Sequence, residues 1–386
     1  MNQPRKLPGV FHVFLLGMLQ ILVWGGSFFL MAVMADPIMK ETGWASQWVY
    51  GALSLSILVS ALLAPLTGRL IARYGGRPIL ASSGLGVAVG LFLMAISASL
   101  PMFLLSWAAI GVGMALGLYE ALFASLGALY GERAASAITG VTLISGFATT
   151  LSWPAVAFVI EHIGWRATCA AYGVLLLILV APLYLWVLPR GAGPLAKTGA
   201  LPQESLSIDR RIYMLLTTVF ALGAVIMTAM SVQLISLLQG QGYTLAAAIG
   251  LSALLGPSQV GSRVLQVFSR KRHPIWTTLI SVALVAVGML LVTTAPMLTA
   301  FGLVLYGAGN GLRAIVRGLL PLTLMSPTQY VVLMGRMARP ALIGQALTPL
   351  IGGYLLQTWG AGSVLGGLCA LALINVLLVI WLIRLV

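Results

Sequence analysis

The sequence predicts an all-α integral membrane protein in which twelve transmembrane helices form two pseudo-symmetric bundles of six. Of its 386 residues, 60% are hydrophobic and 7% are charged, and the mean hydropathy is +1.05. Such a chain cannot cover itself with an ordinary water-exposed surface, so lipid must be its main solvent. Apolar stretches of about 20 residues, enough to cross the roughly 30 Å hydrocarbon core, recur along it. A third observation, an internal repeat, groups these stretches into two sets.

The repeat is visible in two turns that share one order of residues. The first, at 65–79, reads PLTGRLIARYGGRPI, and the second, at 257–275, reads PSQVGSRVLQVFSRKRHPI. In each, an apolar helix ends at Gly and Arg, and a Pro begins the next helix after a basic turn. Gly140 and Pro154 also stand 195 residues before Gly335 and Pro349. Duplicated bundles of this kind place the functional site between the halves, near the middle of the bilayer.

The expected spans follow from apolar length and from the Pro, Gly and charged residues that bound them. The first six are 10–34, 44–70, 78–98, 102–129, 135–160 and 167–188, and the second six are 211–237, 244–269, 274–294, 298–325, 331–357 and 361–384. The expected domains are therefore an N-terminal bundle at 1–188, a cytoplasmic linker at 189–210 and a C-terminal bundle at 211–386.

The net charge of +14 is explained by topology. With both termini in the cytoplasm, sixteen of the 21 Lys and Arg fall on or near the cytoplasmic side, and only Lys40 and Arg166 fall outside. Membrane proteins carry this asymmetry because positive loops stay in the cytoplasm. We therefore expect a multi-pass protein of the inner (plasma) membrane, monomeric and surrounded by lipid, and no nucleic-acid partner.

Nothing in the sequence predicts a cofactor, a metal or an enzyme. Cys169 and Cys369 lie far apart within apolar runs, without the spacing of metal ligands. The chain has no glycine-rich phosphate-binding motif and no grouping of nucleophile, base and metal ligand. Transport by this chain would have to draw on an ion or substrate gradient.

The basic turn after the second expected span carries a family resemblance. Gly68, Leu70, Arg73, Gly75 and Arg77 match the pattern G-x-L-x-D-R-x-G-R-R, with an alanine at the acidic position. In this turn the chain resembles the major facilitator superfamily, whose members have twelve helices in two domains. The resemblance implies a transporter that works by alternating access, with gating residues in the turn and its repeat: Gly68, Arg69, Arg73, Gly75, Arg77 and Arg263.

The first turn also has a physical interpretation that needs no family. Glycine permits a tight turn and a close approach of helices, and arginines on such a turn can bond the last carbonyls of neighbouring helices. The alternative is that these arginines only orient the chain in the membrane.

A looser resemblance concerns the segment between the fourth and fifth spans. Tyr130, Arg133, Gly140, Ser145 and Gly146 partly match a signature of the monocarboxylate-transporter branch. The acidic residue that this branch has in its first helix is missing near Trp24. The fifth span has no Gly-Pro run similar to the one in drug/proton antiporters. The absence of this run disfavours a role in drug export.

Charged groups inside the expected spans are the main candidates for function, because each costs about 2.5–3.5 kcal/mol on insertion scales. Arg313 and Arg317 lie one turn apart on one face of the tenth span, with Asn310 one turn earlier. Two guanidiniums at this spacing predict a site for a carboxylate or phosphate. Arg263, Arg336 and Arg339 either extend this basic surface or reach to the interface.

Glu120 is the one acidic residue expected within a helix core. The repeat offset puts it in the fourth span at a depth between Arg313 and Arg317. It is either a permanent ion-pair partner of an arginine or a proton carrier. The two roles would combine if a substrate anion bound the arginine and so released Glu120 to take up a proton. Four further polar side chains either bind the substrate or only join helices: Tyr119, Gln20, Trp24 and Gln345.

The sequence thus favours a proton-coupled secondary transporter of a small organic anion of the carboxylate type. An efflux pump for lipophilic or cationic compounds is the alternative, although it would need more acids and fewer cations within the spans. A receptor or assembly subunit would keep the fold without charges at mid-membrane.

Overall fold

The computed structural model describes residues 9–189, 209–268 and 273–386. Contacts divide the chain into one unit of Met1–Ser205 with Met325–Arg339 and a second of Leu206–Leu324 with Pro340–Val386. The first division falls inside the expected linker, most of which lies outside the described residues, as do residues 269–272 of the second basic turn. Residues 325–339 join the first unit, which differs from the expected C-terminal bundle at 211–386.

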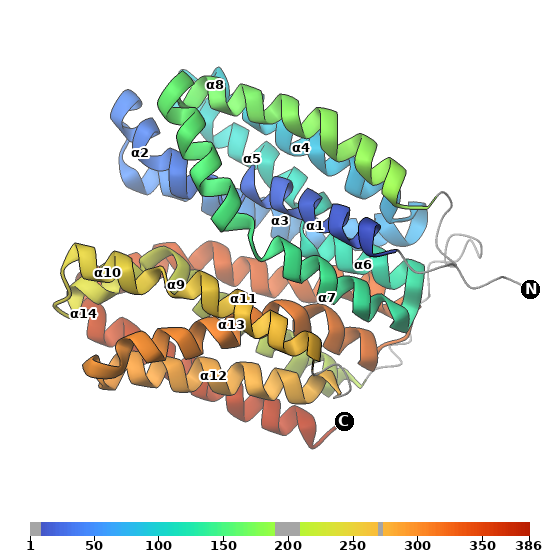
Figure 1. Cartoon of the computed structure of the whole chain (residues 1–386), viewed down its shortest axis with the longest axis vertical. Helices are drawn as coiled ribbons and strands as arrows, with labels where there is room; N and C mark the ends of the chain where they lie inside the picture. Colours follow the sequence, from blue (N-terminus) through green and yellow to red (C-terminus); the bar gives the residue numbers. More distant parts are fainter. Residues whose placement is uncertain (1–8, 190–208, 269–272) are drawn as a thin grey trace, which may run out of the picture. The chain divides into compact units, whose positions relative to one another are not determined.

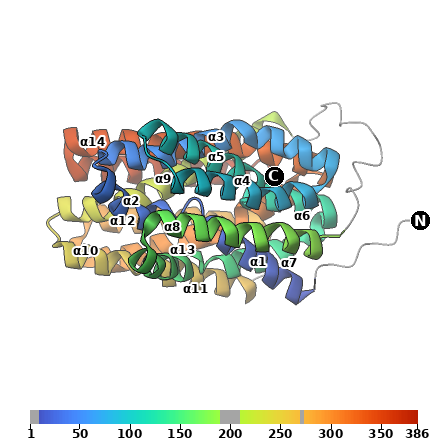
Figure 2. The same ribbon diagram turned by 90° about the horizontal axis from the view of Figure 1, so that it is seen from above.

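The first unit is a helical bundle. Its helices are α1 (Val10–Gly25), α2 (Met31–Thr42), α3 (Ser46–Tyr74), α4 (Gly76–Ala95), α5 (Leu100–Gly117), α6 (Tyr119–Tyr130), α7 (Ala134–Ser145), α8 (Ala148–Val187) and the start of α14 (Pro327–Ile383), with a 3-10 turn at Gly131–Arg133. Helix α8 turns sharply at Gly164, where φ is +76°. Figures 1 and 2 show α4 and α8 side by side, and α1 packs against α8 and α7.

Glycines allow the helices of this bundle to touch backbone to backbone. A Cβ atom added to Gly86 of α4 would lie 2.9 Å from the Cα atom of Gly113 on α5. Without a hydrophobic effect between helices in lipid, such close packing supplies much of the attraction between them.

A polar cluster joins three helices at one end of this unit. The Arg166 Nε atom lies 2.8 Å from Glu41 Oε1, and the Trp165 indole donates to the other oxygen at 2.6 Å. Arg166 also donates to the carbonyl oxygens of Ala95, the last residue of α4, and of Ser97 just beyond it. The end of α2 is therefore attached to α4 and to the second part of α8.

The second unit is also a bundle, with its core between five helices. It contains α9 (Arg210–Gly240), α10 (Leu245–Ser252), α11 (Leu255–Phe268), α12 (Pro274–Thr294), a 3-10 turn (Pro296–Leu298), α13 (Thr299–Leu324) and the rest of α14, which turns at Gly360 with φ +77°. Met230, Met289, Leu303 and Leu365 are fully buried in one cluster. A Cβ atom on Gly288 of α12 would lie 2.5 Å from the Gly302 oxygen of α13, which is the counterpart of the α4–α5 contact.

The backbone repeats its turns in both sets of spans. Gly43 and Gly242 have positive φ between the first and second spans of each set, and Gly164 and Gly360 do so between the fifth and sixth. Only glycine adopts this conformation without strain, so the same turns use the same residue. These paired turns agree with the internal repeat.

Most predicted span ends lie within about four residues of the observed ones, but the first span was predicted to end at 34 whereas α2 continues to Thr42, and four spans are interrupted. The ninth, 274–294, coincides with α12. The first, fourth, fifth and eighth are each divided into two helices: α1 and α2, α5 and α6, α7 and α8, and α10 and α11. Seven described helices are long and apolar enough to cross a membrane, and some shorter apolar helices belong to the interrupted spans.

Candidate functional site

Three interruptions in the first unit place irregular backbone within expected spans. Residues 26–30 separate α1 from α2, Leu118 separates α5 from α6 with ψ −175°, and Gly146 and Phe147 separate α7 from α8. Non-helical backbone at membrane depth is tolerated where protein buries it or where it lines a cavity, because its polar groups need partners. Transporters place such breaks at their binding sites.

Aromatic and hydroxyl side chains connect the three interruptions. The rings of Trp24, next to the first break, and Tyr119, next to the second, have centroids 5.1 Å apart. The Tyr119 hydroxyl is 2.6 Å from the Ser145 hydroxyl, which precedes the third break. Phe123 stacks on Tyr119 from the next turn of α6. The predicted site residues Trp24 and Tyr119 therefore lie together, both partly buried.

Gln20 supports this cluster from inside the bundle and is completely buried. Its amide nitrogen donates to the Gly117 carbonyl at 2.7 Å and to the Tyr184 hydroxyl at 3.0 Å. Its oxygen accepts the Trp24 indole N–H at 3.1 Å. Gln20 thus satisfies a carbonyl beside the Leu118 break and holds the Trp24 ring.

Replacing Gln20 by Leu should destabilise the protein, because it leaves the Gly117 carbonyl and the Trp24 indole buried without partners. We expect a loss of about 1–3 kcal/mol, measured as a lower unfolding temperature in detergent. Gln239→Leu, at an exposed position of α9, is the control. An unchanged unfolding temperature in Gln20→Leu would contradict this role.

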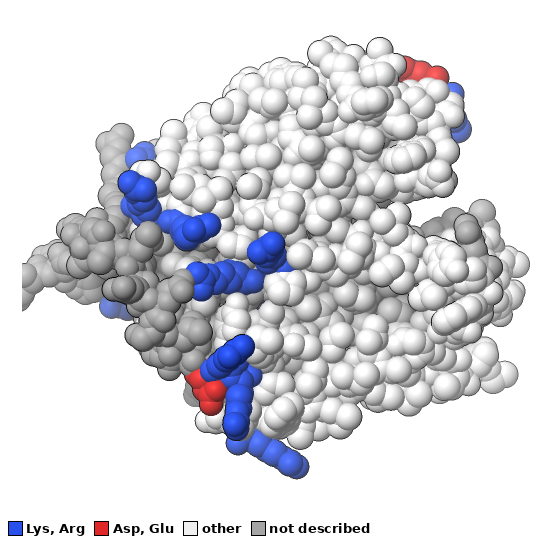
Figure 3. All heavy atoms as spheres, turned by 180° about the vertical axis from the view of Figure 1, so that it is seen from behind, with Lys and Arg blue, Asp and Glu red and all other residues white. Residues whose placement is uncertain are grey.

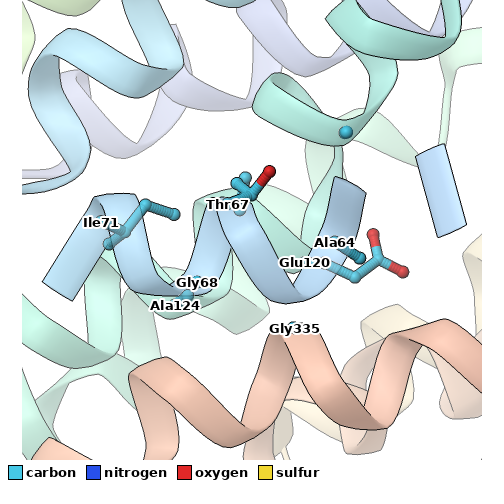
Figure 4. Close-up of a pocket in the computed structure, with 9 residues that line it drawn as sticks. Ala64, Thr67, Gly68, Ile71, Glu120, Ala124 and Gly335 are labelled. Carbon is cyan, nitrogen blue, oxygen red and sulfur yellow. The ribbon is translucent and has the colours of Figure 1, made fainter. Parts of the chain in front are cut away.

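Glu120 lies in the first turn of α6, directly after the Leu118 break. It lines a cavity of about 200 Å³ whose other walls come from α3, α5, α6 and α14 and are nearly all apolar. Figure 4 shows this cavity with Glu120 next to Ala64 of α3. The helix N-terminus favours a negative charge on this side chain, whereas the apolar walls favour a neutral one.

The same cavity is bounded by a very close contact between α3 and the start of α14. A Cβ atom on Gly335 would lie 2.3 Å from the Ala64 carbonyl oxygen, and one on Gly68 would lie 3.0 Å from that of Val331. Figure 4 shows Gly68 and Gly335 facing each other. The predicted gating residue Gly68 therefore belongs to a backbone contact that any larger residue would open.

Gly335→Ala should weaken this contact, because backbone atoms cannot move aside as a flexible side chain can. We expect a loss of about 1–3 kcal/mol, measured as a fall in the unfolding temperature. Gly353→Ala is the matched control, since it lies on the same helix with no atom within 4 Å of the added group. Equal effects of the two substitutions would refute this explanation.

The remaining predicted gating residues of the first turn lie in the last turns of α3 and at the start of α4. Gly75 ends this helix with φ +83°, and Arg77 donates through Nε to the Leu185 carbonyl near the end of α8 at 2.8 Å. Arg77 thus bonds a helix-terminal carbonyl, as predicted for this turn. Arg73 lies over the Tyr74 ring, 5.2 Å from its centroid, and Arg69 is exposed. On the face seen in Figure 3, most of the visible Lys and Arg side chains lie on one side of the picture.

In the second unit, Arg313 lines an internal cavity with an empty volume of about 260 Å³. Helices α9, α12, α13 and α14 form its walls. The Arg313 Nε atom donates to the Asn310 oxygen at 2.9 Å, which confirms that the two predicted residues share one face of α13. Gly223 of α9 makes room for the arginine stem, since a Cβ atom there would lie 3.0 Å from Arg313 Cδ. The guanidinium therefore lies inside this bundle.

The other predicted residues of this unit do not belong to the lining of that cavity. Arg263 of α11 is buried, donates to the Gly311 carbonyl at 3.2 Å, and is near enough for its charge to act on Arg313. Gln345 of α14 is buried and donates to Thr228 of α9 at 3.0 Å. Arg317 is partly buried one turn beyond Arg313. In the first unit, Arg336 is partly buried and Arg339 is exposed.

Sequence reasoning missed Tyr306 and Asn375, which line the Arg313 cavity. The Tyr306 hydroxyl and the Asn375 side-chain oxygen are buried and make no hydrogen bond within the described residues. A polar residue alone in an apolar span was the available signal, and Tyr306 also precedes Arg313 by seven residues, which is two helical turns. No sequence spacing connects Asn375 with Arg313, and only the packing of the helices brings Asn375 to this cavity.

A comparison with protein families decides the identity of the fold. The family model described as Major Facilitator Superfamily matches residues 16–335, most of the chain. The chain belongs to the major facilitator superfamily. This superfamily consists of membrane transporters with the twelve-helix fold predicted above, so both the resemblance and the fold class are confirmed.

Solved structures of the superfamily have the same fold at low sequence identity. The chain is similar to the human organic anion transporter MFSD10, with 19% identity, a TM-score of 0.75, and coverage of 98% of this chain and 100% of that one. It is also similar to the proton:xylose symporter XylE, with 13% identity, a TM-score of 0.73, and coverage of 95% and 94%. No curated protein sequence matches the chain significantly.

Proposed function

We propose that this member of the major facilitator superfamily is a secondary transporter that carries a small organic anion by alternating access, coupled to protons. The observation that carries the proposal is Arg313, a charged side chain inside a cavity of a bundle that is poor in acids. Residues 206–324 and 340–386 contain a single acidic residue, Asp209. Its carboxylate caps the start of α9 by accepting from the Arg211 backbone N–H at 2.7 Å.

Arg313 is partly buried, and a guanidinium inside a membrane-spanning bundle needs a compensating negative group, because an isolated charge in the membrane interior is costly. The sequence of the second unit supplies no carboxylate for this purpose within its spans. An anionic substrate would supply one, bound through Arg313 with Asn310 and, in our proposal, Arg317. Of the similar structures, one is titled an organic anion transporter, which agrees with this class of substrate.

Glu120 is the proposed coupling residue, and the aromatic cluster around Tyr119 and Trp24 is the proposed contact for the organic part of the substrate. Glu120 is suited to proton exchange by its place between a helix N-terminus and an apolar cavity. In this proposal, Gln20 affects substrate binding by holding the Trp24 ring in place. Gln345 contributes by joining α14 to α9. We propose that both termini are cytoplasmic and that the protein works as a monomer in the inner membrane.

The alternative, a proton-driven efflux pump for lipophilic or cationic compounds, is favoured by one feature. In the first unit, Glu120 is next in sequence to Tyr119, whose ring belongs to an aromatic cluster, and carboxylates and aromatic rings both attract cations. The two proposals assign opposite charges to the substrate, so a transport assay separates them.

The test is uptake by purified protein in liposomes whose interior is more alkaline than the medium. Radiolabelled small carboxylates, an aliphatic sulfonate and a lipophilic cation should be compared. We expect the anions to accumulate and a protonophore to abolish the accumulation. Protein-free liposomes are essential controls because weak acids cross as neutral molecules, whereas the sulfonate stays charged. Transport of the cation alone would overturn the proposal in favour of the alternative.

A further inference from the structure

The cavity around Arg313 contains more unused hydrogen-bonding capacity than a packed helix interface needs. Tyr306 and Asn375 are 2% and 4% exposed, yet the Tyr306 hydroxyl and the Asn375 oxygen have no partner within the described residues. Buried polar groups in proteins are nearly always bonded, so two unbonded ones on a single cavity indicate a missing ligand. Of the Arg313 nitrogens, Nε bonds Asn310. The described residues provide no acceptor for its two terminal amino groups.

We propose that this cavity is a binding site for one small monovalent anionic group, in which the Tyr306 hydroxyl and the Asn375 amide donate beside the Arg313 guanidinium. The tyrosine donates O–H, and an amide rotated by 180° presents its NH₂ group with the same shape. Neither residue belongs to the proposed transport site described above. If the bound group is the carboxylate of the substrate, this inference rests on the proposed function. If the bound group is chloride, the inference is independent of that function.

The charge and size of the cavity define the ligand. Its empty volume of about 260 Å³ includes the gaps between side chains and open solvent, so the space left for a bound group is much smaller. The space accepts a chloride ion or a carboxylate head, and a longer chain would have to extend outside it. One guanidinium lines the cavity, so a single negative charge compensates it, although Arg263 nearby adds to the attraction.

The test is the unfolding temperature of the full-length purified protein in chloride-free buffer, with ionic strength held by sodium sulfate. Sodium chloride, sodium acetate and sodium benzoate are titrated separately. A bound anion raises the unfolding temperature along a saturating curve, whereas a general salt effect does not saturate. A larger effect of acetate than of chloride assigns the site to the substrate's carboxylate, and an effect of chloride alone assigns it to an inorganic ion.

The decisive variant is Tyr306→Phe. Its hydroxyl has no partner in the unliganded cavity, so without added anion the unfolding temperature should stay equal or rise. With anion, the half-saturating concentration should increase at least about tenfold, because a hydrogen bond to a charged group is lost. Tyr184→Phe is the matched control: its hydroxyl accepts from Gln20, so stability should fall while the anion effect persists.

A second variant keeps the result interpretable if the tyrosine substitution disturbs folding. Asn375→Asp places a fixed carboxylate in the cavity and should remove the effect of added anion. The proposal is overturned if none of the three anions gives a saturating shift, or if the shift is unchanged in both variants. Uptake in liposomes separates the two proposals: uptake that is unchanged in Tyr306→Phe refutes the cavity as a substrate subsite, and a saturating shift without uptake refutes the transport function alone.

Discussion

Arg313→Gln should abolish anion uptake at substrate concentrations that saturate the unaltered protein. Glutamine keeps a donor for Asn310 but removes the one charged group among the described residues that line the cavity of the second unit. Truncating one partner of a buried charged pair costs about 2–5 kcal/mol, which corresponds to an affinity at least about thirtyfold lower. The measurement is the concentration dependence of uptake into liposomes.

The control for this experiment is Arg384→Gln, an exposed arginine after the end of α14. It removes the same net charge without touching the cavity, so uptake should be unchanged. The unfolding temperature of Arg313→Gln without substrate should not fall, since an uncompensated buried charge has been removed. If Arg313→Gln transports as well as the Arg384 variant, the anion is bound elsewhere and Arg313 has a structural role.

Glu120→Gln should uncouple transport from the proton gradient. If one proton moves with each monovalent anion, a gradient of one pH unit supports an accumulation of about tenfold. Glutamine resembles the protonated carboxyl but cannot release a proton. We therefore expect the accumulation ratio to fall to about one, whereas exchange of labelled for unlabelled substrate continues. Both quantities are measured on the same liposomes.

Glu161→Gln, at an exposed position of α8, is the matched control and should accumulate substrate normally. The separation between lost accumulation and retained exchange distinguishes coupling from a general loss of folding. Proton-driven accumulation that persists in Glu120→Gln would remove this residue from the coupling mechanism and leave the α6 cavity with a packing role.

The sequence predicted the number and ends of the spans because insertion into lipid depends on the summed hydropathy of each segment. The ninth span coincides with α12, and Gly75 ends α3 within the predicted basic turn. It also placed Asn310 and Arg313 on one helix face, because helical periodicity is local. These features need no knowledge of neighbouring helices.

The interrupted helices and the composition of the Arg313 cavity were decided by tertiary structure. The Leu118 break carries no Pro and is stabilised by Gln20 of α1, which bonds the Gly117 carbonyl across 97 residues of sequence. Tyr306 and Asn375 meet at the Arg313 cavity only because α13 and α14 pack there. Hydropathy assigns each residue to lipid or water by itself, whereas these contacts depend on pairs of helices, and one sequence contains no direct record of such pairs.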